Sequence, residues 1–286
     1  MIQSMTGFGK ASLQLPTKKI TVEIKSLNSK GLDLNTRMPS VFREMELGLR
    51  NQISQRLERG KVDFSLYVEV TGEETTSKIN VPIVKGYINQ MKAVIPNADE
   101  TELMKMAVRM PDALKTERDE IDENEWKQIQ TVIDEALENI ANFRKDEGAS
   151  LEKEFQLRIA NINNLMNEAV SYDAERVETV KTRLRTALDE LKVNVDENRF
   201  EQELIFYLEK YDITEEKVRL GNHLSYFLET LNGTEANGRK LGFITQEMGR
   251  EINTMGSKSN HTEMQKLVVM MKDELEKIKE QVLNVL

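Results

Sequence analysis

The chain has 286 residues and a net charge of −9; 31% of its residues are charged, 39% are hydrophobic and 6% are aromatic. It contains no cysteine, which excludes a disulfide framework and a thiolate metal site. No apolar run is long enough to cross a membrane, and the N-terminus lacks the basic-then-apolar pattern of a secretory signal. We therefore expect a cytoplasmic protein with no membrane partner.

The charge is unevenly distributed along the chain. Residues 17–61 contain ten basic and five acidic side chains, whereas residues 98–126 contain four basic and ten acidic ones. The overall acidity argues against indiscriminate nucleic-acid binding, but the basic N-terminal region is compatible with a polyanion partner. Alternatively, the two regions face each other across an oligomer interface.

The N-terminal region, residues 1–75, predicts β-strands around one helix. Polar and apolar residues alternate over residues 19–28 and again over residues 62–70, the pattern of half-buried strands. The alternation resumes after Gly31, which predicts a hairpin near residues 29–31. Apolar residues at helical spacing between these strands predict the helix. Strands packed on a helix indicate a small antiparallel sheet and an α+β fold.

Residues 76–195 predict a helical region with long, coiled-coil-like helices. Apolar residues follow a strict three-four alternation from Phe155 to Leu191, with Asp173 as the only polar member. A continuous helix over residues 150–192 would be roughly 65 Å long, which is typical of a hairpin, a hinge or an oligomer. Glu147 and Gly148 interrupt the apolar stripe, and we predict a hinge there.

Residues 196–286 predict a C-terminal helical domain. Asp196 and Thr214 are expected to cap two successive helices. On the second helix Glu216, Arg219 and His223 lie on one side. His223 is a candidate general base or metal ligand, although a hydrogen-bonded surface histidine is the commoner explanation of such a residue.

The most unusual stretch is residues 235–260, which four glycines interrupt although its apolar residues keep helical spacing. Its polar face mixes cations, carboxylates and amides, as a phosphate-handling site requires. Glu247 and Glu251 are spaced to hold a hard cation such as magnesium or manganese. From spacing alone, a solvated face with ion pairs such as Glu247 with Arg250 is the simpler interpretation.

Five blocks spread over the whole chain resemble the YicC/YloC family of bacterial proteins, and the match is close to its Gram-positive YloC branch. The blocks are residues 4–9; 23–28 with Leu32 and 37–39; 59–61; 198–204 with Asp212, Glu215, Glu216, Arg219, Leu220 and His223; and 238–241 with Gln246, Glu247, Arg250, Glu251, Asn253, Thr254 and 257–259. One departure is Gly242, which stands where family members commonly have aspartate. If that aspartate were an essential ligand, this chain would lack it.

The resemblance implies a stress-induced, metal-dependent endoribonuclease that hydrolyses RNA and works as a ring-like hexamer enclosing its substrate. The implied cofactor is a divalent cation, magnesium or manganese. The expected catalytic residues are Glu216, His223, Glu247, Arg250 and Glu251, of which Glu216, His223, Glu247 and Glu251 are also the expected metal ligands. The expected RNA-binding residues are Lys25, Asn28, Arg37, Arg59, Lys61, Arg219, Arg239, Lys240, Gln246, Asn253 and Lys258.

Two other functions fit the same residues. The first alternative is an RNA-binding adaptor that delivers RNA to another nuclease without cutting it. The second is an oligomeric scaffold whose charged surfaces are interfaces between subunits. Cleavage of RNA that disappears when Glu251 is replaced separates the nuclease from both alternatives.

Overall fold

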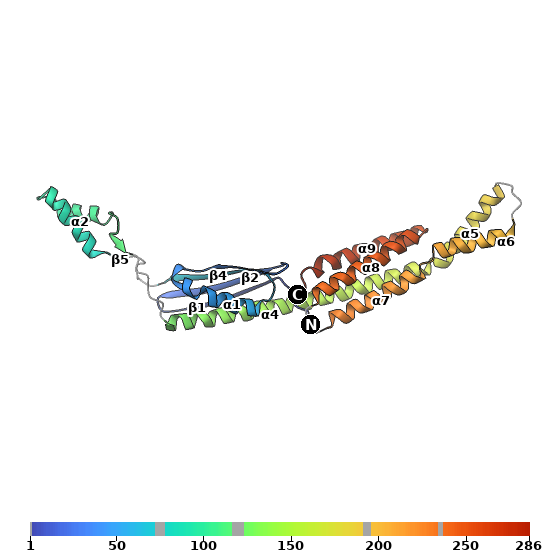
Figure 1. The fold of residues 1–286 in the computed structure, drawn as a ribbon, viewed down its shortest axis with the longest axis horizontal. Coiled ribbons are helices and arrows are strands. Elements are labelled where there is room, and N and C mark those ends of the chain that lie inside the picture. Colours follow the sequence, from blue (N-terminus) through green and yellow to red (C-terminus); the bar gives the residue numbers. More distant parts are fainter. Residues whose placement is uncertain (1, 72–77, 116–122, 191–195, 234–236) are drawn as a thin grey trace.

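The computed structural model describes residues 2–71, 78–115, 123–190, 196–233 and 237–286. A sheet and a bundle of helices lie end to end along one long helix, α4 (Glu123–Ser171), in an elongated molecule (Figure 1). With 49 residues, α4 is roughly 74 Å long. The predicted α+β fold is confirmed.

The sheet has four strands: β1 (Gly7–Gln14), β2 (Lys18–Leu27), β3 (Leu32–Arg37) and β4 (Gly60–Val70). Their order is β1-β2-β4-β3, and β3 runs parallel to β4 while the other pairs are antiparallel. The predicted hairpin at residues 29–31 and the all-antiparallel sheet are therefore wrong. β4 has the more apolar inward face and takes the position beside β2, so β3 is left at the edge.

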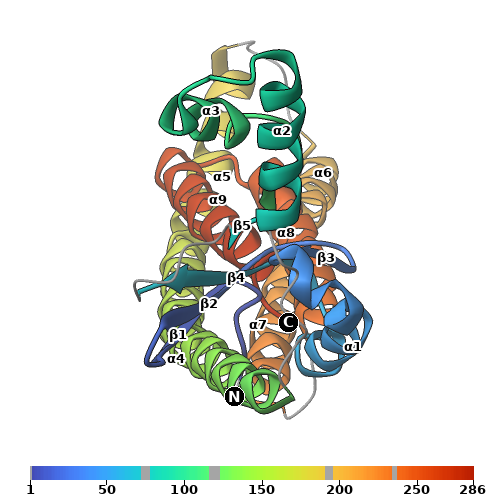
Figure 2. The same ribbon diagram turned by 90° about the vertical axis from the view of Figure 1, so that its left-hand side faces the viewer.

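All of the helices that pack on this sheet lie on one of its faces. In the end-on view α4 lies below the strands and α1 (Glu46–Arg56) to their right (Figure 2). A short 3₁₀ helix, η1 (Ser40–Met45), leads into α1. A Cβ atom on Gly9 of β1 would lie 2.2 Å from the carbonyl oxygen of Ala136, so only glycine allows α4 to approach this closely. The inward side chains and both helices form one core, which includes Ile20, Val22, Ile24, Ile53, Phe64, Ile129 and Ile133.

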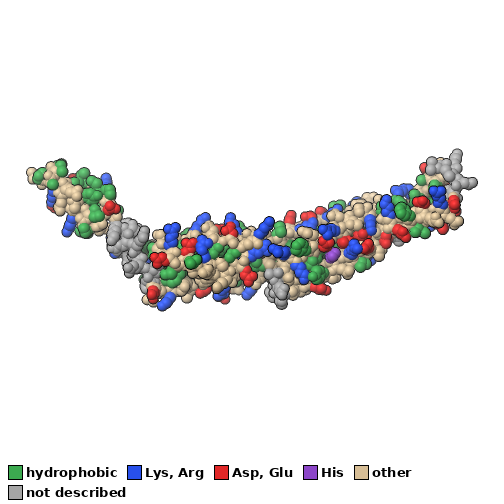
Figure 3. Space-filling view, in the orientation of Figure 1, with side chains coloured by type: hydrophobic (Ala, Val, Ile, Leu, Met, Phe, Trp, Pro, Cys, Tyr) green, Lys and Arg blue, Asp and Glu red, His purple; other side chains and the backbone are tan. Residues whose placement is uncertain are grey.

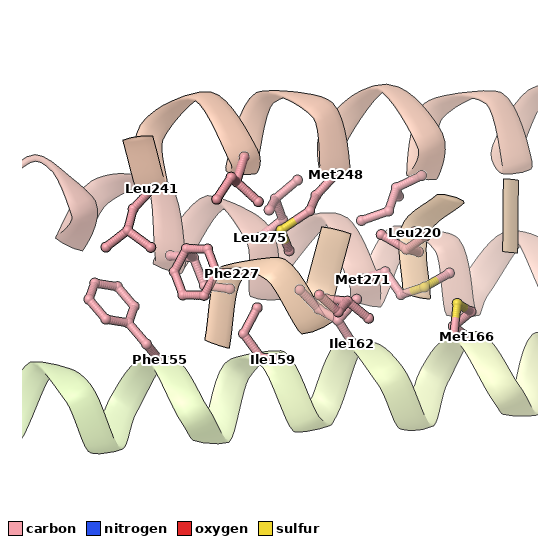
Figure 4. Packing of buried hydrophobic residues seen from close by; sticks show 14 of the residues in the cluster. Phe155, Ile159, Ile162, Met166, Leu220, Phe227, Leu241, Met248, Met271 and Leu275 are labelled. Atoms are coloured by element: carbon pink, nitrogen blue, oxygen red, sulfur yellow. The ribbon is translucent and has the colours of Figure 1, made fainter. Parts of the chain in front are cut away.

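The second half of α4 packs with α7 (Thr214–Leu231), α8 (Gly238–Lys258) and α9 (Thr262–Val282). Figure 4 shows the apolar side chains of the four helices pointing toward one another. The part of the predicted seam that belongs to α4 thus packs inside the chain's own bundle. The residues of the bundle core that Figure 4 labels are Phe155, Ile159, Ile162, Met166, Leu220, Phe227, Leu241, Met248, Met271 and Leu275.

The predicted hinge at Glu147 and Gly148 is wrong, because α4 continues through both residues. Gly148 instead makes room for the N-terminal segment: a Cβ atom there would lie 2.1 Å from the carbonyl oxygen of Ile2. The long helix is interrupted at Tyr172, after which α5 (Asp173–Glu190) begins. Residues 191 and 192, the end of the predicted helix, lie outside the described residues.

Beyond the bundle, α5 is followed by α6 (Glu197–Lys210), which Asp196 caps as predicted. The predicted Thr214 cap is wrong, because the carboxylate of Asp212 accepts the hydrogen bond from the Thr214 amide at 2.9 Å. The short strands β5 (Lys78–Ile79) and β6 (Leu114–Lys115) form a small unit with α2 (Val81–Val94) and α3 (Glu100–Ala107). In the described part of the chain no helix is long and apolar enough to span a membrane.

Candidate active site

The polar residues predicted on α7 and α8 come together because these helices are antiparallel neighbours. The ammonium of Lys258, at the end of α8, lies 2.8 Å from Oε1 of Glu216, at the beginning of α7. Glu216 is only 4% exposed. The end of α8 is itself held in place, since the buried guanidinium of Arg176 on α5 donates hydrogen bonds to the carbonyls of Lys258 at 3.2 Å and Tyr211 at 2.5 Å.

This ion pair sets the register of the two helices. His223 follows Glu216 by seven residues, and Glu251 precedes Lys258 by seven. Seven residues are almost two helical turns, about 10.5 Å, and return to nearly the same face. Because Glu216 and Lys258 face each other, we infer that His223 and Glu251 also face each other, two turns further along the α7–α8 pair.

Two carboxylates in this arrangement have at least one oxygen without a partner among the described residues. Oε2 of Glu216 is buried without a hydrogen bond. Glu251 is only 9% exposed and forms no hydrogen bond or ion pair with any residue that the structure describes. Burying a charge without a partner is costly, so unpaired buried carboxylates are expected where a ligand supplies the partner. Glu216 and Glu251 are therefore the strongest candidates for site residues on this chain.

The other predicted residues of the C-terminal half lie on its surface. Glu247 pairs with the exposed Arg250 at 2.8 Å, and the exposed Arg219 pairs with Glu215. The Nζ of Lys240 lies 4.7 Å from the centre of the Tyr226 ring. The exposed cationic side chains on these two helices are suited to contacting the phosphates of a polyanion. Arg239, Gln246 and Asn253 are exposed as well.

Comparisons with known proteins cover nearly the whole chain. The family model described as "Endoribonuclease YicC-like, N-terminal region" matches residues 2–153, and the family model described as "Endoribonuclease YicC-like, C-terminal" matches residues 168–286. The chain belongs to the YicC-like endoribonuclease family. The boundary between the two matches falls within α4, the helix shared by the sheet and the bundle.

Two YicC-like relatives align with this chain from end to end. It is 33% identical over 293 residues to the "Probable endoribonuclease YicC" of Clostridioides difficile, with 100% of both chains covered. It is 29% identical over 287 residues to the protein of the same description from Haemophilus influenzae, with 99% of both covered. The family predicted from the sequence blocks is confirmed.

The structure also clarifies the departure at Gly242 of this YicC-like chain. A Cβ atom at Gly242 would meet its nearest neighbour, Cγ1 of Val282, at an ordinary 3.8 Å. Neither the backbone conformation nor packing therefore requires glycine at this position. A Cβ atom is accommodated at this position.

A divalent cation is expected from the family resemblance, and the donor groups determine which kind the site suits. In the described residues no three His, Asp or Glu side chains are grouped closely enough to hold a metal ion. Mg²⁺, however, is usually held by only one or two carboxylates together with water and substrate phosphates. Glu216 and Glu251 lie about two helical turns apart in this register, so either carboxylate fits that mode of binding by itself. The four expected ligands do not form one cage made only of protein groups in the described structure.

The predicted RNA-binding residues of the N-terminal half lie in the sheet, away from the α7–α8 pair. Lys25, Arg37 and Lys61 extend from the face that α4 does not cover, and Asn28 is exposed just after β2. Arg59 donates a hydrogen bond from Nε to the carbonyl of Ser29 at 2.8 Å. Within one chain the two predicted sets therefore belong to different halves of the molecule, joined by α4.

Proposed function

We propose that this chain is an endoribonuclease that hydrolyses RNA phosphodiester bonds at the α7–α8 site. The observation that carries the proposal is the buried Glu251, which has no hydrogen-bond or ion-pair partner among the described residues. The register inferred from the Glu216–Lys258 pair would place the half-buried His223 opposite it. The proposal is supported by the two relatives, each described as a probable endoribonuclease.

The chemistry required at this site is acid-base catalysis next to a bound phosphate. Imidazole is the side chain most often used to move protons in enzymes, so His223 is suited to act as base, acid or ligand. Lys258 contacts only Oε1 of Glu216, which leaves Oε2 of that carboxylate available as a donor atom. Arg250 is exposed and would hold the scissile phosphate through paired N–H donors.

We propose a divalent cation, magnesium or manganese, as the cofactor. Of the expected ligands Glu216, His223, Glu247 and Glu251, we propose that Glu251 would hold it, with water and an RNA phosphate completing the coordination. The described residues contain no group of three such side chains close enough to share one ion. When bound, such an ion polarises the phosphate and lowers the pKa of a bound water.

We further propose that the chain assembles into a ring-like hexamer that encloses RNA. The reason is that the cations of the sheet and the α7–α8 site belong to different halves of one elongated chain (Figure 1). An assembly would bring the sheet of one copy near the site of another. Light scattering at micromolar concentration should give a hexamer, and a monomeric mass would contradict this assembly.

The decisive experiment measures cleavage of labelled RNA by wild type and Glu251→Gln, with and without a chelator. The substitution keeps the size of the side chain and removes its charge, so cleavage should fall by at least about a hundredfold, the loss typical when a key catalytic group is removed. RNA affinity and assembly should change little. Glu229→Gln, which changes an exposed carboxylate on the neighbouring helix α7, is the matched control and should cut at the wild-type rate.

Other outcomes separate the alternatives. Wild-type cleavage by Glu251→Gln would show that the assignment of Glu251 is wrong. Binding of RNA by the wild type without cleavage would identify an adaptor, and neither activity would identify a scaffold. Failure of Glu251→Gln to assemble would make Glu251 a structural residue.

A further inference from the structure

The four-stranded sheet has an exposed face that carries the expected RNA-binding residues Lys25, Arg37 and Lys61 together with two aromatic rings. Successive side chains of a strand point to opposite faces, and the inward set on β1, β2 and β4 packs against α4. The outward set is polar or exposed along all four strands. It comprises Phe8, Lys10, Ser12, Gln14, Lys19, Thr21, Glu23, Lys25, Leu27, Asp33, Asn35, Arg37, Lys61, Asp63, Ser65, Tyr67 and Glu69, and we call it the open sheet face.

Two aromatic rings stand on the open sheet face without being buried. Phe8 on β1 is 40% exposed, and Tyr67 on β4 is 49% exposed. The strand register pairs Phe8 with Lys25 and Tyr67 with Thr21 of the strand between them. The two rings are therefore two strand spacings apart across the sheet and four residues apart along the strand direction. This corresponds to a diagonal Cα–Cα distance of roughly 16 Å.

One cation lies close to the Phe8 ring, and a second lies on the same face. The Nζ of Lys25 lies 5.7 Å from the centre of the Phe8 ring. Lys61 pairs with Leu27 in the sheet register, one step along β2 from Lys25. A flat surface with aromatic rings and cations together matches the stacking surfaces on which proteins bind unpaired bases.

The charge balance of the open sheet face favours stacking over attraction of phosphates. Lys10, Lys19, Lys25, Lys61 and Arg37 are opposed by Glu23, Asp33, Asp63 and Glu69, a net charge of only +1. The ammonium of Lys10, 2.9 Å from Glu23, lowers the pKa of that carboxyl and keeps it ionised. Both signs are interspersed along the visible face of the molecule (Figure 3).

Such a balance is poorly suited to a duplex, which offers little besides phosphates to a flat surface. We propose that the open sheet face binds single-stranded RNA, with Phe8 and Tyr67 stacking against unpaired bases and Lys25 and Lys61 contacting the flanking phosphates. This proposal rests on the proposed function and specifies its substrate further. The RNA that is cleaved at the α7–α8 site would have an unpaired segment bound to the open sheet face.

The test measures the affinity of full-length protein for a labelled single-stranded oligoribonucleotide, for a duplex of the same sequence and for an abasic ribose-phosphate oligomer. The variants are Phe8→Leu and Tyr67→Leu, which keep an apolar side chain and remove the ring. Each should weaken binding of the single strand roughly tenfold, in the range found for loss of one stacked base. Binding of the abasic oligomer should stay within about twofold of wild type, since phosphate contacts are unchanged.

Phe206→Leu is the matched control, because Phe206 is an exposed ring on α6, 65% exposed and outside the sheet. It should leave all three affinities unchanged, and circular dichroism should show native folding for every variant. Unchanged single-strand affinity in Phe8→Leu and Tyr67→Leu would overturn the proposal while leaving the nuclease assignment intact. A change in sedimentation of these variants without RNA would also overturn it, by making this face a protein interface. A wild type that binds no RNA would overturn both proposals.

Discussion

Oε1 of Glu216 accepts a hydrogen bond from Nζ of Lys258 at 2.8 Å, although 42 residues separate them in the chain. The contact joins the first turn of α7 to the last turn of α8. It neutralises a carboxylate that the fold has buried, and it determines which residues face each other along the two helices. The candidate site depends on this register.

Removing the partner of Glu216 should destabilise the fold. Lys258→Met leaves a buried carboxylate without its cation and should lower the free energy of unfolding by about 2–3 kcal/mol. This is less than the roughly 3–5 kcal/mol for a fully buried pair, because Lys258 retains 26% of its side-chain exposure. Chemical denaturation measures the change.

The matched control for this prediction removes both charges. In the double variant Glu216→Gln, Lys258→Met no charge is left unpaired, and most of the lost stability should return. A double variant as unstable as the sum of the single variants would show that the two residues do not interact.

The acid sensitivity of the bundle should depend on Glu274 of α9. Burial tends to raise the pKa of this carboxyl, but hydrogen bonds from Lys277 at 2.5 Å, Asn161 at 2.9 Å and Arg158 at 3.3 Å lower its pKa to about 2. Because the folded pKa lies below the unfolded value of about 4.3, the ionised group stabilises the fold above that pH. This stabilisation should be lost as the pH falls from about 4.5 to about 2.

Measuring the free energy of unfolding against pH for wild type and Glu274→Gln tests this window. The variant should be less stable than wild type at neutral pH, and the difference should shrink as the pH falls toward 2. A constant difference over that range would contradict the assignment. Glu263→Gln, an exposed carboxylate at the start of the same helix, serves as the control.

Two glycines inside helices should respond in opposite ways to alanine. At Gly148 a Cβ atom would lie 2.1 Å from the backbone oxygen of Ile2, so Gly148→Ala should destabilise the protein by about 2 kcal/mol. At Gly242 the nearest contact is an ordinary 3.8 Å to Val282, so Gly242→Ala should stabilise it by about 0.5–1 kcal/mol. Thermal and denaturant unfolding measure both, and stabilisation by Gly148→Ala would show that the N-terminal segment does not pack there.

RNA affinity should depend strongly on salt, because the expected contacts of Lys25, Arg37 and Lys61 are with phosphates. A fourfold rise in salt should weaken binding at least about tenfold, and Lys61→Gln should reduce the slope of the logarithmic plot by roughly 0.7 for a single strand. Lys266→Gln, an exposed lysine of α9 outside the predicted RNA set, should leave the slope unchanged. An affinity independent of salt would exclude phosphate contacts.

Much of the local structure was predictable because it depends on neighbours in the chain. Alternation within residues 62–70 predicted β4, and the short-range carboxylate at Asp196 predicted the cap of α6. The mistakes concern pairing at a distance. The spacing around Gly31 is equally compatible with a β2–β3 hairpin and with the observed arrangement, in which β3 pairs with β4. Likewise, the presence of Gly148 in α4 does not by itself indicate that Ile2 packs against it.

The sequence by itself determined the fold class, the family and the types of side chain available for chemistry, because periodicity and motif blocks are properties of the chain. Only the tertiary structure decided that Glu216 pairs with Lys258, that Glu251 is buried without a partner among the described residues, and that Phe8 and Tyr67 share one exposed face. The physical reason is that burial and pairing depend on which helices and strands become neighbours. Local spacing assigns a residue to a face, but only packing determines what that face meets.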